Sequence, residues 1–190
     1  MKVATYLALA FAPVVIGAMA MPGCSTAPPS QEAKQSLSQE AKGAMDQIYT
    51  DAPGLRDFID HAEAYAIFPN VGKGGVGVGG AYGRGEVYQH GQLIGYADLS
   101  QGSIGLQLGG QTFSELIAFE TPEALQNFKD NKLAFAANAS AVAIKSGVAS
   151  AARFENGVAT FVRPLGGAMF EASVGGQQFT FQPANSGQPQ

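Results

Sequence analysis

The spacing of apolar residues changes along the chain, from helical near the N-terminus to alternating further on. Over residues 32–49 apolar positions recur every three or four residues, with Glu, Lys and Gln between them, which is typical of an amphipathic helix. Asp51–Gly54 interrupts this pattern with a proline and a glycine. Residues 55–62 then resume the helical spacing, so the sequence predicts a long helix followed by a short one.

From Tyr65 onward the pattern indicates strands. Tyr65–Phe68 predicts a buried strand that ends at Pro69–Asn70. Residues 74–88 alternate small and larger side chains, which predicts a strand or hairpin whose backbone closely approaches a neighbour. The Ala-rich residues 133–143 fit either a helix or a strand. Further strands are predicted over residues 92–99, 103–111, 112–120, 151–154, 158–162 and 169–181.

Local signals place one more helix and one turn among the strands. Thr121, Pro122 and Glu123 supply an N-cap, a proline in the first turn and an acidic residue, so a short helix is expected over 122–130. Glu155–Gly157 predicts a hairpin turn. The order predicts an α+β fold, in which N-terminal helices pack on a mainly antiparallel, Gly-rich β-sandwich or barrel-like sheet.

The N-terminal segment has the composition of a secretory signal. Lys2 precedes an uncharged, apolar stretch over residues 4–20. Residues 21–25 follow, and their small residue before Cys24 resembles the bacterial lipobox. That resemblance implies cleavage before Cys24 and acylation of Cys24, and several acyl chains hold a protein stably on a membrane.

Ordinary secretion is the alternative for this segment. Cleavage after Ala18 or Ala20 would leave Cys24 as a free thiol. In the lipoprotein interpretation, an Asp after the cysteine would direct sorting to the inner membrane. The residue at this position is Ser25, which favours location on the periplasmic face of the outer membrane.

The expected organisation has four parts. A lipoprotein signal peptide occupies residues 1–23, and a polar, Pro-containing tether occupies 24–31. Residues 32–181 form one domain, and residues 182–190 form a disordered tail.

Composition narrows the range of functions. The chain has 190 residues, a formal net charge of -4, only 14% charged residues and no run of Lys or Arg. Nucleic acids bind clustered cations, so this distribution argues against a nucleic-acid partner. Cys24 is the one cysteine and His61 and His90 are the two histidines, which argues against a metal site or another cofactor.

Candidate catalytic patterns are weak. Gly75–Gly80 formally matches a dinucleotide fingerprint, with Asp98 as the ribose-binding acid, but residues 81–85 cannot begin the helix that this motif requires. A Gly-rich strand packed closely on a neighbour is the preferred interpretation. His61 next to acidic residues is more typical of a solvated histidine than of a base, and Ser140 with Lys145 is a poor catalytic pair. We therefore expect no enzyme.

Small residues in the strands would allow strands to approach closely, or leave a groove for a long apolar guest. Five apolar residues of the sheet could line such a groove or form the core, and the core is the preferred interpretation for each of them. These residues are Leu106, Leu108, Phe113, Ile117 and Phe119.

Three blocks of the chain resemble the SYLF domain family. They are the Gly-rich residues 64–85, then 103–111 followed by 116–119, and finally 135–140. Eukaryotic members of that family bind phosphoinositides, fungal members also bind and bundle actin, and bacterial members are mostly secreted or lipoproteins, some of them phospholipid-binding. An actin partner does not fit a protein of a bacterial envelope.

The resemblance implies a lipid-binding module without catalysis, whose partner is a phospholipid membrane. Lys73 and Arg84 flank the Gly-rich block in positions that match the family, and Lys34 and Lys42 lie on the N-terminal helix. These four are the expected lipid-binding residues, each acting as a point charge on a phosphate. The alternative is a structural lipoprotein whose exposed sheet edge binds a protein partner of the envelope.

Overall fold

The computed structural model of the chain describes residues 26–132, 134–136, 141–144 and 152–185. The expected signal peptide, Cys24, Ser140 and Lys145 lie outside the described residues. The elements in chain order are α1 (Gln31–Asp51), α2 (Leu55–Asp60), β1 (Ala64–Gln89), β2 (Gln92–Phe119), α3 (Pro122–Lys129), β3 (Ala134–Ala136), β4 (Ala141–Ala143) and β5 (Val158–Pro183).

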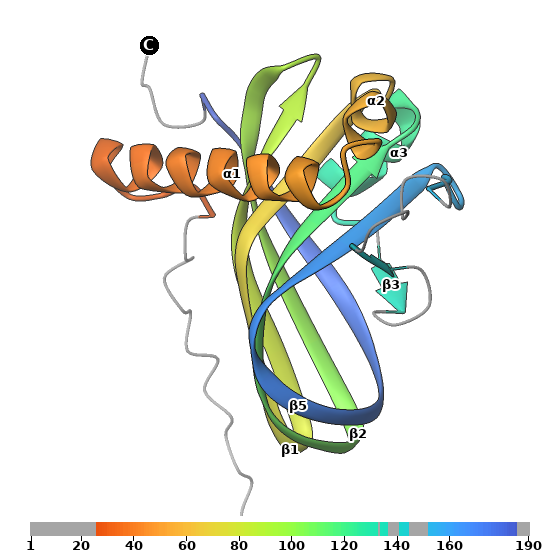
Figure 1. The fold of residues 1–190 in the computed structure, drawn as a ribbon. Coiled ribbons are helices and arrows are strands. Elements are labelled where there is room, and N and C mark those ends of the chain that lie inside the picture. Colours follow the sequence, from red (N-terminus) through yellow and green to blue (C-terminus); the bar gives the residue numbers. More distant parts are fainter. Residues whose placement is uncertain (1–25, 133, 137–140, 145–151, 186–190) are drawn as a thin grey trace, which may run out of the picture.

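The strands form one mostly antiparallel sheet, and helices lie against it (Figure 1). The order across the sheet is β1-β2-β5-β3, and β4 pairs in parallel with β5. This confirms the α+β class and the antiparallel character. Over the described residues the pairing forms an open path that begins at β1.

The three helices confirm the sequence predictions, and their ends follow from capping. The side chain of Ser30 accepts from the backbone N–H of Ala33 at the start of α1. The side chain of Thr121 accepts from the backbone N–H of Ala124 at the start of α3, and Pro122 lies in the first turn of that helix. These caps satisfy amide groups that a helix leaves without an internal partner.

The strands are longer than predicted, because pairing continues through the expected breaks, in some places with a bulge. The predicted end of the first strand at Pro69–Asn70 is wrong: β1 continues, and its pairing with β2 shifts register between Phe68 and Val71. The bulge accommodates the proline, whose carbonyl accepts from Ser114 Oγ at 2.8 Å. The predicted strand 151–154 is also wrong over 152–154, which form no strand; the nearest pairing is an isolated bridge between Glu155 and Val158.

Each long strand runs away from the helices, bends sharply and returns (Figure 1). In β1 the bend lies at Gly77, whose φ is +71°, and the register with β2 shifts between Val76 and Val78. As a result the two halves of β1 lie against each other. A Cβ placed on Gly83 would be 2.7 Å from Val71 Cγ2 and 3.0 Å from the carbonyl oxygen of Asn70.

Buried apolar residues form two clusters, one on each face of the sheet at the first half of β1. Helices α1 and α2 cover one face, where Ile48 and Leu55 pack with Ile67, Leu116 and Phe161. On the other face the sheet packs with α3, through a cluster that includes Phe68, Phe119, Leu125, Phe128 and Phe179. Both clusters lie near the helices, so the part of the sheet around the bend has no helical cover.

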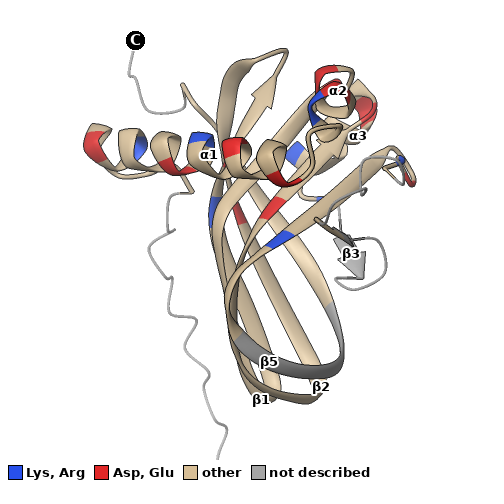
Figure 2. Cartoon of the chain, viewed as in Figure 1, with Lys and Arg blue, Asp and Glu red and all other residues tan. Residues whose placement is uncertain are grey.

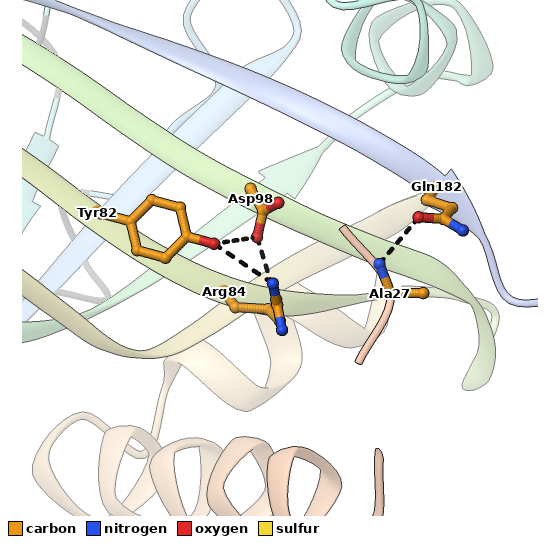
Figure 3. A network of polar contacts seen from close by, with 5 residues as sticks. All are labelled: Ala27, Tyr82, Arg84, Asp98 and Gln182. Carbon is orange, nitrogen blue, oxygen red and sulfur yellow. Dashed lines mark hydrogen bonds and ion pairs between the residues drawn. The ribbon is translucent and has the colours of Figure 1, made fainter. Parts of the chain in front are cut away.

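The ends of the described chain are attached to the sheet. Thr26 is buried, and Ala27 N–H donates to Gln182 Oε1 at 2.9 Å (Figure 3). Strand β5 extends to Pro183, and Ala184 N–H donates to the carbonyl of Ile94. The expected tether and tail are therefore ordered in part, since each contributes residues to the sheet surface.

Candidate functional site

The bend of β1 and β2 exposes an unusual set of large apolar side chains. We call this region, residues 76–78 of β1 and 104–108 of β2, the distal tip. The exposed fractions are Val76 76%, Val78 66%, Ile104 71%, Leu106 67% and Leu108 62%. The core interpretation is confirmed for Phe113, Ile117 and Phe119, but it is wrong for Leu106 and Leu108, because the strand bends away from the core before it reaches them.

These side chains lie next to one another across the two strands. Val76 pairs with Leu108 and Val78 with Ile104, and Leu106 lies in the bulge between the two pairs. Side chains that are directly opposite in an antiparallel pair have Cβ atoms about 5 Å apart. The five residues therefore form one continuous apolar surface, and continuous exposed apolar patches mark interaction sites.

The interior of the distal tip is polar. Ser103 and Gln107 are 3% and 2% exposed, although each is next to an exposed apolar residue. Gln107 Nε2 donates to the carbonyl oxygens of Ser103 at 3.1 Å and Gly77 at 3.2 Å, and Ser103 Oγ donates to Gln107 Oε1 at 2.9 Å. One glutamine thus holds both strands of the bend together, with polar groups inside and apolar groups outside.

No charged residue occurs in the two strand segments that form the distal tip and its approaches. Residues 74–83 and 99–114 contain no Asp, Glu, Lys or Arg. Figure 2 shows the charged residues gathered in the half of the molecule that carries the helices, while the described parts of the lower ends of β1 and β2 are free of them. The apolar face of β1 and β2 at the distal tip therefore carries no charge, while on the neighbouring strand β5 one acidic residue, Glu171, pairs with Gln107.

A polar network marks where the uncharged segments end. Arg84 Nε lies 3.2 Å from Asp98 Oδ1 across the β1–β2 pair. The hydroxyl of Tyr82 donates to the same carboxylate oxygen at 2.9 Å, and Figure 3 shows the three side chains converging. Asp98 is thus engaged by a cation and a phenol, and the ring of Tyr82 remains half exposed beside the apolar surface.

A buried carboxyl group lies deeper in the sheet. Glu115 is 0% exposed, Gln177 Nε2 donates to its Oε2 at 3.0 Å, and its Oε1 has no hydrogen-bond partner among the described residues. Burial raises the pKa of Glu115 from 4.5 to about 7, against the lowering effects of Gln177 and Lys73. Sequence reasoning missed this group, because a single Glu in an apolar stretch is usually a surface residue.

Because of this carboxyl group, we expect the free energy of unfolding to fall as the pH rises from about 4.5 to about 7. In that window the folded state holds a proton that the unfolded state has lost, so deprotonation favours unfolding. The shift corresponds to at most about 3 kcal/mol. We expect Glu115→Gln to abolish most of this pH dependence and to raise the unfolding midpoint at pH above 7. Denaturant unfolding of both chains across this pH range measures the effect, and an equal slope in both would contradict it.

The structure does not gather the four expected lipid-binding cations at the distal tip. Lys34 and Lys42 lie on α1, where the Lys34 ammonium is 5.6 Å from the ring centroid of Tyr96 and Lys42 is exposed. Lys73 is only 8% exposed and is close enough to influence Glu115. Arg84 is paired with Asp98. Of the four, Lys42 is the most open to solvent.

Of the catalytic candidates, the structure describes the Gly-rich segment and His61, while Ser140 and Lys145 lie outside the described residues. The Gly75–Gly80 segment lies within β1 and continues as strand, which confirms the Gly-rich strand, and its glycines approach one another so closely that a Cβ on Gly75 would be 2.5 Å from Gly79 Cα. His61 is exposed, and its Nδ1 hydrogen-bonds with the backbone oxygen of Asp57 at 2.7 Å.

The described residues were also compared with the requirements of a metal site and of a membrane-spanning helix. They contain no group of three or more His, Cys, Asp or Glu side chains arranged to bind a metal ion. None of their helices combines the length and apolar character needed to span a membrane.

No protein-family model matches the chain, and no curated protein matches it.

Proposed function

We propose that the chain is a lipid-binding module of the bacterial cell envelope, held at the membrane by acylated Cys24 and without catalytic activity. The observation that carries this proposal is the apolar, uncharged surface of the distal tip, with side chains 62–76% exposed. Burying apolar surface is favourable by about 25 cal/mol per Å², so a surface of this kind binds to an apolar phase. The resemblance to the SYLF family supports the same function.

Different parts of the chain would contribute in different ways. Acyl chains on Cys24 supply the permanent attachment, on the periplasmic face of the outer membrane. Lys34 and Lys42 lie on α1, at the other end of the sheet from the distal tip, so we propose them as contacts to lipid phosphates for that end of the module, each as a point charge. Lys73 and Arg84 keep this role only as secondary candidates, because one is buried and the other is paired with Asp98.

We further propose that the bent sheet is a sandwich, whose two layers are the two halves of β1, β2 and β5. The support is the close approach of the two halves of β1 at Gly83 and Gly85, and the buried cluster of phenylalanines between the sheet and α3. Such a body would present the distal tip at one end and the helices at the other.

A structural, protein-binding lipoprotein is the second candidate. Its support is that β1 lies at the end of the strand order and, over the described residues, pairs only with β2. An unpaired edge of this kind can accept a strand from another protein.

Vesicle flotation of the mature chain carrying Cys24→Ser tests the proposal, because this variant cannot be acylated. We expect it to float with phospholipid vesicles, and to stay bound when NaCl is raised to about 1 M, since salt screens charges but does not weaken apolar contacts. Salt-sensitive binding would instead assign the main contact to Lys34 and Lys42.

Failure of the variant to float with any envelope phospholipid at low salt would contradict lipid binding. A stable stoichiometric protein partner, recovered by crosslinking and co-purification, would then favour the second candidate.

A further inference from the structure

We propose that the distal tip is a shallow wedge that enters the acyl-chain boundary of a bilayer, and that it does so without selecting a lipid headgroup. This inference rests on the proposed function and specifies its mode. Its ligand is the hydrocarbon of the lipid, so it differs from the binding of phosphates by lysine or arginine.

The distribution of polarity in the distal tip is the first argument. In water, folding normally buries apolar side chains and exposes polar ones. Here Gln107 and Ser103 are buried, while Ile104, Leu106 and Leu108 point outward. The inverse arrangement is stable where the surroundings are apolar, because there hydrogen-bonding groups must be satisfied internally and apolar groups gain nothing by being buried.

The hydrogen bonds inside the distal tip are the second argument. Gln107 connects the carbonyl of Gly77 in β1 to the carbonyl and hydroxyl of Ser103 in β2. The shape of the bend is therefore fixed by polar contacts that do not require water outside. These bonds strengthen when the surroundings have a low dielectric constant, so the tip would enter lipid as a preformed element.

The surface around the bend distinguishes lipid from a protein as the occupant. Apolar side chains lie on both strands and on both sides of Gly77, and residues 74–83 and 99–114 offer no charge to pair with. Specific protein interfaces have a polar rim that fixes the register of the partners. The five apolar side chains offer no charged group of their own to a protein partner, and a bilayer requires none.

Two features limit the depth of insertion. Over the described residues β1 pairs on one side only, so its free edge carries backbone groups that cost free energy in hydrocarbon. Further along β1, the half-exposed ring of Tyr82 and the Arg84–Asp98 pair form a polar limit. Tyr is enriched at the level of the headgroups, where its ring lies in apolar surroundings and its hydroxyl in polar ones. The inserted part therefore reaches from Tyr82, at the level of the headgroups, to Leu106 at the bend.

Tryptophan fluorescence tests this placement, because the chain contains no Trp. In the mature Cys24→Ser chain, Leu106→Trp reports on the distal tip in the middle of β2. Gln92→Trp reports on the first residue of β2, away from the bend. The probe is a vesicle of phosphatidylcholine with bromine on its acyl chains, which quenches nearby indole. We expect a blue shift and at least about twofold quenching for Leu106→Trp, stronger with bromine near the headgroup than near the chain end, and no change for Gln92→Trp.

The outcomes separate the inference from the proposed function. If both variants float with vesicles but Leu106→Trp is quenched no more than Gln92→Trp, lipid binding stands and the wedge is overturned. The wedge is also overturned if Leu106→Trp is already blue-shifted without vesicles in a concentration-dependent way, with sedimentation as a dimer, since the occupant is then a second copy. Failure of both variants and the parent to float overturns the proposed function itself.

Discussion

Replacing Ile104, Leu106 and Leu108 together by Ser is expected to weaken binding of the Cys24→Ser chain to phospholipid vesicles by about a hundredfold or more. Each side chain is 62–71% exposed in the free protein and loses its contact with water on binding. Full burial of one such side chain contributes about 1.5–3 kcal/mol, and a loss of about 1 kcal/mol at each of the three positions already gives a hundredfold effect. Flotation at a series of lipid concentrations measures the partition coefficient.

Leu165→Ser is the matched control for this triple variant. Leu165 is an exposed apolar residue of β5 at 42%, outside the distal tip, and its loss is expected to change binding less than threefold, on the order of 0.5 kcal/mol. Both chains should unfold at the same denaturant midpoint as the parent, because exposed side chains contribute little to folding. Equal loss of binding in the two variants would show that the distal tip has no special part in it.

Local sequence signals were sufficient for the helices. Ser30 and Thr121 cap α1 and α3, and the apolar residues of α1 are the ones that the structure buries. These features depend on contacts within one turn of helix, and a sequence pattern contains that information directly. The α+β class followed from the order of the elements for the same reason.

The orientation of the strand faces could not be predicted. Alternation in β2 identifies two faces, but it does not say which one is turned inward. The usual assumption, apolar inside, placed Leu106 and Leu108 in the core, whereas the structure buries Gln107 between them. The sequence did contain one signal for this inverted burial: short polar residues alternate with aliphatic ones in a segment without charge.

The long-range path of the strands was also hidden in the sequence. Glycine is abundant throughout β1, and nothing local distinguishes Gly77, which bends with φ at +71°, from Gly85, which lies against another part of the same strand. That difference arises only from tertiary packing. Glu115 was missed because its surroundings come from strands distant in sequence: it pairs with Phe68 and Val162 and accepts a hydrogen bond from Gln177.

Gly85→Ala is expected to destabilise the fold by about 3 kcal/mol, because the two halves of β1 leave no room for a methyl group. A Cβ at this position would overlap the carbonyl oxygen of Ile67 and would lie 2.7 Å from Cδ1 of Phe68. The first is backbone in a paired strand and the second belongs to a ring that is 0% exposed, so neither can move away at low cost.

Gly72→Ala is the control for this substitution, since it also changes a glycine of β1 to alanine but a Cβ there would meet nothing within 4 Å. It is expected to leave the denaturant midpoint unchanged or slightly raised, because Ala lowers the entropy of the unfolded chain. If the two variants unfold at the same midpoint, the halves of β1 do not lie against each other in solution. The bend at Gly77 would then not hold the apolar residues together as one surface, so this measurement bears on the wedge without any lipid present.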